Sequence, residues 1–325
     1  MPSSAQTRHQ LQRLLVRTGM VRTYEALRGL LRGQGVCILM GHRVLDDDDP
    51  QAGLQRSQLA ELIECLQRRY RIVPLEEACR QLAAQVREPL IVLTFDDGYA
   101  DNYRNMWPVI RACEVPATIF ITTSFIGTRR RIWTLEVHDW LRRTPVPLAE
   151  PAEAVVGRLK RLPVAERETA LAGLCRRLGV TPTEATDAER MMTAEELREI
   201  ATDPLITIGA HTAHHEILST VPPQQAQVEI AESAADLERL LGERPRVFAY
   251  PNGGRGDYTP EHVAMLQELG FEAAVTTMVG LNRPGGDPLQ LWRMPFGTGE
   301  CVQLAWRMST LRHCHRGPVA PLAAD

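Results

Sequence analysis

The sequence contains little lysine, few aromatic residues and no long apolar segment. Lys160 is its only lysine, so arginine carries almost all of the positive charge, which we attribute to codon usage in GC-rich DNA. The 37 basic and 40 acidic residues nearly cancel, so we expect no nucleic-acid partner bound through bulk charge. Since no run of about 18 apolar residues occurs, we also expect no membrane-spanning helix.

Cysteine pairs are missing as well. The seven cysteines are an odd number and none form a C-x-x-C motif, so we expect neither a disulfide framework nor a cysteine-based zinc site. Scattered cysteines favour a reducing compartment. Residues 1–35 are interrupted by arginines and lack the unbroken apolar stretch of a secretory signal. Together these absences predict a cytoplasmic protein.

The chain divides into a basic N-terminal segment over 1–34, a main domain over 35–300 and a C-terminal tail over 301–325. Within residues 8–32, six arginines face one acid, Glu25, and leucines recur near helical spacing. The segment could therefore be an amphipathic helix in peripheral contact with the inner membrane surface. A helix packed on the domain, with its arginines in water, explains the same pattern.

The main domain alternates strands and helices from Gly35 onward. This alternation is typical of an α/β protein with a parallel sheet, either open or closed into a barrel. The gap over 123–204 holds two helical stretches, and we interpret it as an insertion over one face without a second core. The predicted strands are 36–41, 71–74, 90–96, 116–122, 205–210, 246–251 and 272–277.

Functional groups of parallel α/β folds gather at the carboxyl ends of the strands. The strand over 90–96 ends in two adjacent carboxylates, Asp96 and Asp97, and Gly98 allows the chain to turn there. Adjacent carboxylates repel each other and stay ionised most easily beside a cation. Either acid could instead cap the following helix, but Asp101 and Asn102 could do this equally well.

Three histidines follow the strand over 205–210. His211 and His215 are four residues apart, which would place both imidazoles on one side of a helical turn and suits two ligands of one metal ion, whereas His214 would lie off that side. One carboxylate with two imidazoles makes an open site for zinc or a similar divalent ion, and the second carboxylate is then free to act as a base. A structural metal site would normally be closed by four protein ligands.

Two further strand ends are candidate parts of the site. The turn from Pro251 to Gly254 exposes backbone N–H groups that could hold an oxyanion, although a plain turn has the same pattern. His42 follows the first strand and should open onto the metal face, although it could equally be a hydrogen-bonded structural residue. The acidic block over 46–49 lacks the pattern of an EF-hand and is interpreted as a solvated loop.

The run Thr94-Phe95-Asp96-Asp97-Gly98, together with His211-Thr212-x-x-His215, resembles the polysaccharide deacetylases of carbohydrate esterase family 4, which share the nodulation-type chito-oligosaccharide deacetylase homology domain. The resemblance spans about residues 35–297. It implies a deformed seven-stranded (β/α) barrel. It also implies that Asp96 is the general base and that Asp97, His211 and His215 bind a divalent metal, usually zinc.

This sequence departs from the family pattern at three places. The usual Arg-x-Pro-Tyr turn is replaced by Ala249-Tyr250-Pro251-Asn252, so we expect Arg293 to orient the base and the backbone N–H of Asn252 to hold the oxyanion. Glu216 stands where the family has proline after the second histidine. The usual late Leu-x-His acid is matched only by Leu311-Arg312-His313, in a basic tail, and we therefore favour His42 as the general acid.

The resemblance implies a metal-dependent hydrolase that removes N-acetyl groups from an amino-sugar unit of a glycan or glycan precursor, with an N-acetylated oligo- or polysaccharide as the partner. Another amide hydrolase of the same superfamily, such as a deformylase or an allantoinase-like enzyme, and a non-catalytic glycan-binding protein remain alternatives. Aromatic residues make up only 5% of the chain, which predicts no extended stacking groove. The candidate sugar contacts are Trp133, Trp140, Tyr250 and Trp292, of which the first two could belong to a lid or to a core.

Overall fold

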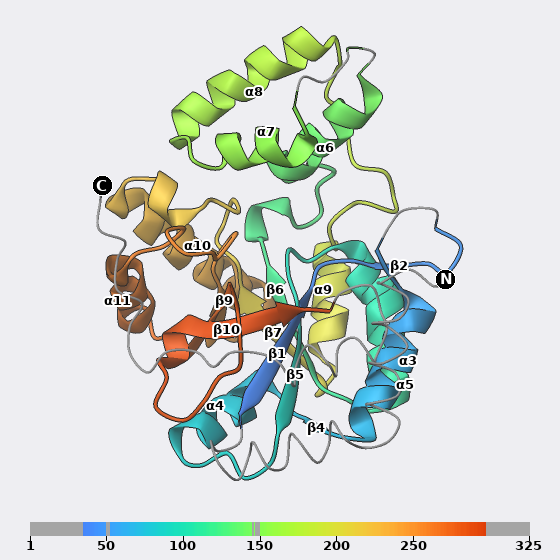
Figure 1. The fold of residues 1–325 in the computed structure, drawn as a ribbon, viewed down its shortest axis with the longest axis vertical. Coiled ribbons are helices and arrows are strands. Elements are labelled where there is room, and N and C mark those ends of the chain that lie inside the picture. Colours follow the sequence, from blue (N-terminus) through green and yellow to red (C-terminus); the bar gives the residue numbers. More distant parts are fainter. Residues whose placement is uncertain (1–34, 50–52, 145, 147–149, 297–325) are drawn as a thin grey trace, which may run out of the picture.

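The computed structural model describes residues 35–49, 53–144, 146 and 150–296, and its centre is a closed barrel of parallel strands (Figure 1). Going round the barrel, β1 pairs with β5 on one side and with β10 on the other, and the remaining strands follow in chain order. The predicted α/β class and the deformed seven-stranded (β/α) barrel are therefore confirmed. Its strands are β1 (Val36–Gly41), β5 (Leu90–Phe95), β6 (Ala117–Ile121), β7 (Ile206–Ala210), β8 (Val247–Ala249), β9 (Ala273–Val279) and β10 (Leu291–Pro295).

One of the seven strands differs from the prediction. The segment predicted as a strand over 71–74 forms only β4 (Arg71–Ile72), which pairs with the first residues of β5 and does not belong to the closed ring. The seventh strand is β10, which was not predicted because Arg293 and Pro295 interrupt its apolar residues. β4 and β6 share one side of β5, with β6 pairing only at Thr94 and Phe95, and this sharing deforms the barrel.

Alternation along the strands sorts their side chains into an inner and an outer core. Val36 and Ile38 of β1 belong to the inner apolar cluster, whereas Cys37 and Leu39 belong to the outer one. Helix α4 (Leu75–Ala83) packs Leu75, Ala78 and Leu82 into the inner cluster and so closes the barrel at the end where the strands begin (Figure 1). The end where the strands finish is left for the site.

The outer cluster is covered by helices that surround the barrel. In α3 the buried stripe is Leu59, Leu62, Ile63 and Leu66, and a capping box of Thr193 with Glu196 begins α9. Two short strands, β2 (Val44–Leu45) and β3 (Leu54–Gln55), pair beside them. The surrounding helices are α3 (Arg56–Gln67), α5 (Trp107–Cys113), α9 (Ala194–Ala201), α10 (Pro223–Leu241) and α11 (Pro260–Glu268).

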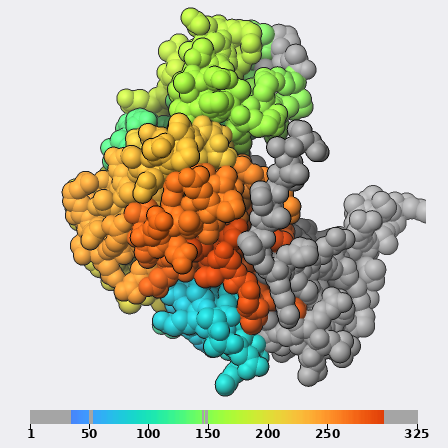
Figure 2. All heavy atoms as spheres, turned by 90° about the vertical axis from the view of Figure 1, so that its left-hand side faces the viewer, coloured from blue at the N-terminus to red at the C-terminus, as the bar shows by residue number. Residues whose placement is uncertain are grey.

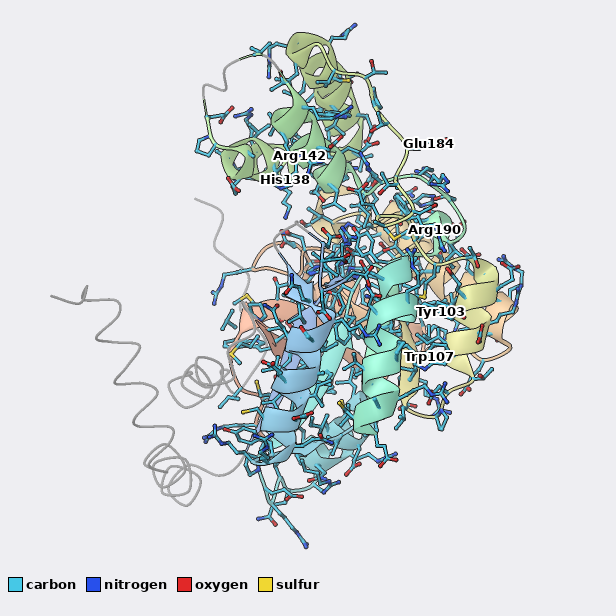
Figure 3. The ribbon with its side chains drawn as sticks, turned by 90° about the vertical axis from the view of Figure 1, so that its right-hand side faces the viewer. Tyr103, Trp107, His138, Arg142, Glu184 and Arg190 are labelled. Carbon is cyan, nitrogen blue, oxygen red and sulfur yellow. The ribbon has the colours of Figure 1, made fainter. Side chains whose placement is uncertain are left out.

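Hydrogen bonds hold neighbouring helices together on one side of the barrel. A short π-helical turn, η1 (Asn102–Met106), leads into α5. The Tyr103 hydroxyl donates to Glu199 at 2.7 Å, and Trp107 Nε1 donates to Asp203 at 2.8 Å, which ties η1 and α5 to α9 and the loop that follows it (Figure 3). This segment follows directly on the strand end that carries the two candidate carboxylates.

The insertion lies beyond the carboxyl ends of the strands (Figure 1) and stands out as a lobe in the space-filling view (Figure 2). It contains three helices before α9 rather than the two helical stretches that were predicted: α6 (Trp133–Arg143), α7 (Ala152–Leu159) and α8 (Val164–Leu178). Their apolar faces pack on one another around Val137, Trp140, Leu159, Leu174 and Leu178, separately from the barrel clusters. The expectation that the insertion has no core of its own is therefore wrong.

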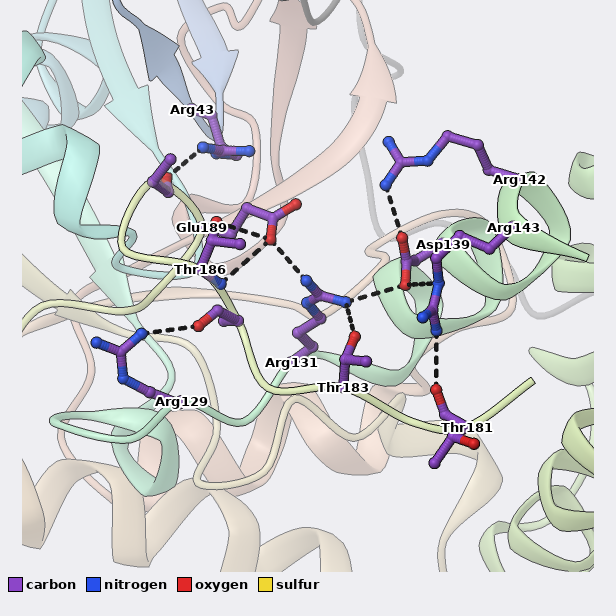
Figure 4. A network of polar contacts seen from close by, with 12 residues as sticks. Arg43, Arg129, Arg131, Asp139, Arg142, Arg143, Thr181, Thr183, Thr186 and Glu189 are labelled. Carbon is purple, nitrogen blue, oxygen red and sulfur yellow. Dashed lines mark hydrogen bonds and ion pairs between the residues drawn. The ribbon is translucent and has the colours of Figure 1, made fainter.

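Polar contacts fix the base of this lobe. Arg131 lies just before α6 and donates to Asp139 at 3.1 Å and to Glu189 at 2.6 Å, so one guanidinium joins α6 to the segment that leads to α9 (Figure 4). Arg142 and Arg143 also contact Asp139, with N–O distances of 2.6 and 2.8 Å. The contact of Arg131 with Glu189 thus joins the two segments that connect the lobe to the barrel, whereas the contacts of Arg142 and Arg143 lie within α6.

None of the helices in the described part of the chain is long and apolar enough to cross a membrane. Cys65 is disulfide-bonded, which the sequence analysis did not expect, whereas Cys79, Cys113 and Cys175 are thiols. The predicted basic helix over 8–32 and the Leu311-Arg312-His313 tail lie outside the described residues. The predictions made for them, and the predicted domain boundaries, stay predictions.

Candidate active site

The two carboxylates lie where β5 reaches the open end of the barrel. Leu90 and Val92 point into the inner cluster, so the same alternation carries Thr94 and then Asp96 towards the interior. Asp97 and Gly98 both adopt left-handed backbone angles, with φ of 75° and 88°, and a Cβ on Gly98 would lie 2.9 Å from the Ile121 side chain. This turn lets Asp96 and Asp97 face different partners.

Asp96 is held by Arg293 of β10. Arg293 Nη1 and Nη2 donate to Asp96 Oδ1 and Oδ2, each at 2.7 Å, and Arg293 Nε donates to the Thr276 carbonyl at 2.8 Å. Both side chains are buried. Burial by itself raises the pKa of Asp96, but the charge and hydrogen bonds of Arg293 outweigh it, and the pKa lies below its usual value. Asp96 is therefore a buried, ionised carboxylate.

Asp97, His211 and His215 form the one group in the described part of the chain that could hold a metal ion, with ligand atoms within 4.8 Å of one another. Asp97 Oδ1 lies 3.5 Å from His211 Nε2 and 3.3 Å from His215 Nε2. Asp97 Oδ1 is buried and has no hydrogen-bond partner, an arrangement that is costly unless a cation completes it. Burial opposes ionisation of Asp97, yet the neighbouring imidazoles hold its pKa well below the usual range.

The orientation of His211 also fits a metal ligand. Its Nδ1 lies 2.7 Å from the Ala249 carbonyl oxygen, which can only accept a hydrogen bond, so the ring proton sits on Nδ1. In the neutral imidazole, which is the form that binds a metal, Nε2 is then unprotonated, and it lies 3.5 Å from Asp97 Oδ1. Such an outer hydrogen bond is the usual support of a zinc-ligating histidine, so the three residues fit zinc or a similar divalent ion.

The backbone of the histidine segment is not the helical turn that the spacing suggested. Residues 211–215 form a loop in which Thr212 and His215 both have φ of 59°. Buried Glu229 of α10 fixes this loop, because its carboxylate accepts from the His214 backbone N–H at 2.8 Å and contacts His214 Nδ1 at 2.9 Å. His214 therefore contacts Glu229 and does not belong to the group that could hold a metal ion, in line with the prediction. No sequence motif pointed to Glu229.

In the turn after β8, the backbone N–H of Asn252 has no hydrogen-bond partner among the described residues. Asn252 has φ of 60°, and the next two N–H groups are used locally, since Gly253 donates to the Pro251 carbonyl and Gly254 donates to Asp257. The Asn252 carbonyl accepts from the Thr277 hydroxyl at 2.6 Å. The N–H of Asn252, which was predicted as the oxyanion donor, is left available beside the metal-binding group.

His42 lies at the end of β1, exposed, and lines the same cavity as the four motif residues. The segment that carries it is well held: Asn102 donates to the His42 carbonyl at 2.8 Å, and Arg43 donates to Asp101 at 2.7 Å. Of the other histidines, His262 lies at the start of α11, where its Nδ1 accepts from the Thr259 N–H, and His138 is exposed on α6 (Figure 3). His42 is thus the histidine outside the metal group that lines this cavity.

The cavity has a volume of about 460 Å³ and lies between the barrel and the insertion. Trp133 and its neighbours at the start of α6, with Lys160 after α7, form the wall that the insertion contributes. Of the predicted sugar contacts, Trp133 and Tyr250 line it, whereas Trp140 belongs to the core of the insertion and Trp292 lies away from it. The barrel side is formed by His42, Asp96, Asp97, His211, His215 and Asn252.

Residues 83–274 match the sequence profile of the family described as polysaccharide deacetylase. The chain belongs to the polysaccharide deacetylase family. It is 23% identical to YxkH of Bacillus subtilis (strain 168) over 193 residues. The match covers 59% of this chain and 46% of that curated relative.

Among solved structures, IcaB from Ammonifex degensii is similar at 22% identity with a TM-score of 0.60, covering 84% of this chain and 97% of that one. The Streptococcus pyogenes deacetylase PplD, solved with acetate, is similar at 15% identity and a TM-score of 0.57, covering 85% and 97%. These two likenesses show the shared barrel fold.

Proposed function

We propose that this polysaccharide deacetylase family member is a metal-dependent hydrolase that removes N-acetyl groups from an amino-sugar unit of a glycan or glycan precursor. The observation that carries the proposal is the partnerless Oδ1 of Asp97, 3.5 and 3.3 Å from two imidazole nitrogens, next to an ionised Asp96. Three protein ligands leave open positions, as a catalytic rather than a structural metal site does.

When bound by Asp97, His211 and His215, zinc supplies a Lewis acid that polarises a carbonyl and lowers the pKa of water to about 7. Asp96 takes the proton of the attacking water, since each of its oxygens keeps a second lone pair beyond the one that Arg293 occupies. Arg293 holds this carboxylate in place and keeps it ionised. The two adjacent acids therefore have separate roles because they have separate partners.

The other two roles belong to residues on neighbouring strand ends. The Asn252 backbone N–H donates to the oxygen that gains negative charge when the amide carbonyl is attacked. His42 then gives a proton to the departing amine, the general-acid role that histidine takes most often among side chains. All of these groups line one cavity, so a single bound acetamido group can reach them together.

The test is acetate release from a panel of N-acetylated oligosaccharides, O-acetylated sugars and lipid-linked sugar precursors, with zinc added after removal of bound metal. We expect zinc-dependent release from one or more N-acetylated members. An N-formyl sugar and allantoin belong to the panel, because selective turnover of either would assign the chain to another amide hydrolase class. Glycan binding without any turnover would contradict the proposal. The cytoplasmic location and the peripheral membrane contact stay predictions, which cell fractionation tests.

A further inference from the structure

Lys160, the only lysine of the chain, reaches the active-site cavity from the insertion. It follows α7, is half-buried, and lines the cavity opposite the barrel residues. Its Nζ donates to Asn252 Oδ1, and it makes no ion pair within the described ranges. Burial lowers the pKa of Lys160, and the charge of Asp257 opposes this effect. A cation is thus placed on an amide rather than on a carboxylate.

The contacts of Asn252 show what this lysine holds. A lysine ammonium can only donate and a carboxylate can only accept, so Lys160 and Asp257 together fix which end of the Asn252 amide is which. Asn252 Nδ2 donates to Asp257, Oδ1 accepts from Lys160, and the backbone carbonyl accepts from Thr277. Among the described residues, every polar group of Asn252 except the backbone N–H has a partner, and Lys160 is the partner that the insertion supplies.

The backbone angle of Asn252 explains why the contacts of its side chain are needed. At φ of 60° the residue occupies a small allowed region, which asparagine tolerates better than most residues. The direction of its N–H depends on that angle. Contacts that fix the side chain therefore also fix the direction of the N–H, and removing one of them allows the turn to relax.

A second contact, between Arg167 and Glu216, fixes the insertion beside the metal-binding loop. This contact limits the movement of the lobe that carries Lys160. Arg167 of α8 is fully buried, lies over the Trp133 ring, and donates through Nη2 to both oxygens of Glu216, at 2.7 and 2.8 Å. Glu216 directly follows His215. The lobe therefore contacts the barrel at two places, through Arg167 at the histidine loop and through Lys160 at the Asn252 turn.

We propose that Lys160 is a positioning residue, through which the helical insertion holds Asn252 and so aims its backbone N–H at the reacting carbonyl. The inference rests on the proposed function. It concerns the turn rather than the metal group, so loss of Lys160 should lower turnover without changing metal binding. A lysine that instead contacted substrate directly would act independently of the Asn252 side chain.

A double-variant cycle distinguishes these roles. Lys160→Met keeps the aliphatic stem, and Asn252→Gly removes the side chain while keeping the N–H at a backbone angle that glycine accepts. We expect each single variant to lower kcat by about 10–10²-fold with little change in KM, and the double variant to be no slower than the worse single one. Multiplicative losses in the double variant, or a rise in KM alone, would overturn the proposal.

The control is Arg158→Ala, which removes an exposed cation from α7, two residues before Lys160, and should leave turnover and folding unchanged. A second readout does not need activity. Because the chain has one lysine, ¹⁵N-lysine labelling gives a single side-chain ammonium signal, which should shift in Asn252→Gly. An unchanged signal would refute the contact. A signal that shifts in Asn252→Gly, together with a wild type that releases no acetate, would count against the proposed function alone.

Discussion

Arg293 and Asp96 are 197 residues apart in the chain and form two parallel hydrogen bonds of 2.7 Å across the open end of the barrel. Both arise from strand alternation. Leu291 of β10 points into the inner cluster, so Arg293 points the same way two residues later, as Asp96 does after Val92 on β5. The last strand of the barrel therefore supplies the cation that the usual family turn supplies elsewhere in the sequence.

Arg293→Lys tests this pairing. Lysine keeps the positive charge but replaces the two-pronged guanidinium by a single point charge, so Asp96 loses its fixed orientation. We expect kcat to fall at least about tenfold with zinc content unchanged, measured by acetate release and elemental analysis. Turnover close to that of the wild type would show that Arg293 does not orient the base.

Substitutions of the two adjacent acids should have different effects on turnover and on metal binding. Asp96→Asn removes the proton acceptor, and we expect turnover to be abolished while the metal is retained. Asp97→Asn removes a ligand, so zinc affinity should fall together with turnover. Zinc titration of both variants beside the activity assay separates the roles. If both lost metal equally, and added zinc restored Asp96→Asn, the assigned roles would have to be exchanged.

His42→Ala should lower kcat by about 10²–10⁴-fold, because the departing amine loses its proton donor, with metal content unchanged. His138→Ala is the matched control, since that histidine is exposed on the insertion and does not line the cavity. Near-normal turnover in His42→Ala would move the acid role to another group.

Asp101 should make the fold less stable as pH rises. Burial raises the pKa of Asp101 to about 6 against the opposing charge of Arg43, while the usual value is 3.8. Between these values the folded protein binds more protons than the unfolded chain. The stability that Asp101 contributes is therefore full below about pH 4 and lost as pH rises through about 6, by about 3 kcal/mol.

Urea unfolding of the wild type and of Asp101→Asn from pH 4 to pH 7 measures this effect. The asparagine does not titrate. The free energy of unfolding of the variant should therefore increase relative to that of the wild type as pH rises. A difference between the two proteins that stays constant over this range would contradict the assigned pKa.

The sequence predicted the strands that are apolar throughout, and the prediction failed for the strand that carries a buried charged residue. The run over 90–95 is buried throughout and was easily recognised, whereas β10 carries a buried arginine that is stable only beside Asp96. That partner is distant in sequence, so local composition gives no sign of it. The strand predicted over 71–74 has the right composition, but only Arg71 and Ile72 pair with β5, because Pro74 lacks a backbone N–H and leads into α4.

The candidate site was predictable from strand ends and motif spacing, though not always for the right reason. His211 and His215 meet at Asp97 through a loop with two left-handed residues, not through a helical turn. Glu229 and Lys160 support the site through contacts with His214 and Asn252, and such contacts exist only once distant elements are packed. The assigned roles of the site residues stay predictions.

Zinc dependence of acetate release tests the central claim most directly. Metal-free protein would be titrated with zinc while acetate release from an N-acetylated oligosaccharide is followed, for the wild type and for His211→Ala with His215→Ala. Release in the wild type should rise with added zinc and level off at about one ion per chain, and the double variant should neither retain zinc nor release acetate. Full release by the metal-free wild type, or zinc retained equally by the double variant, would contradict the account.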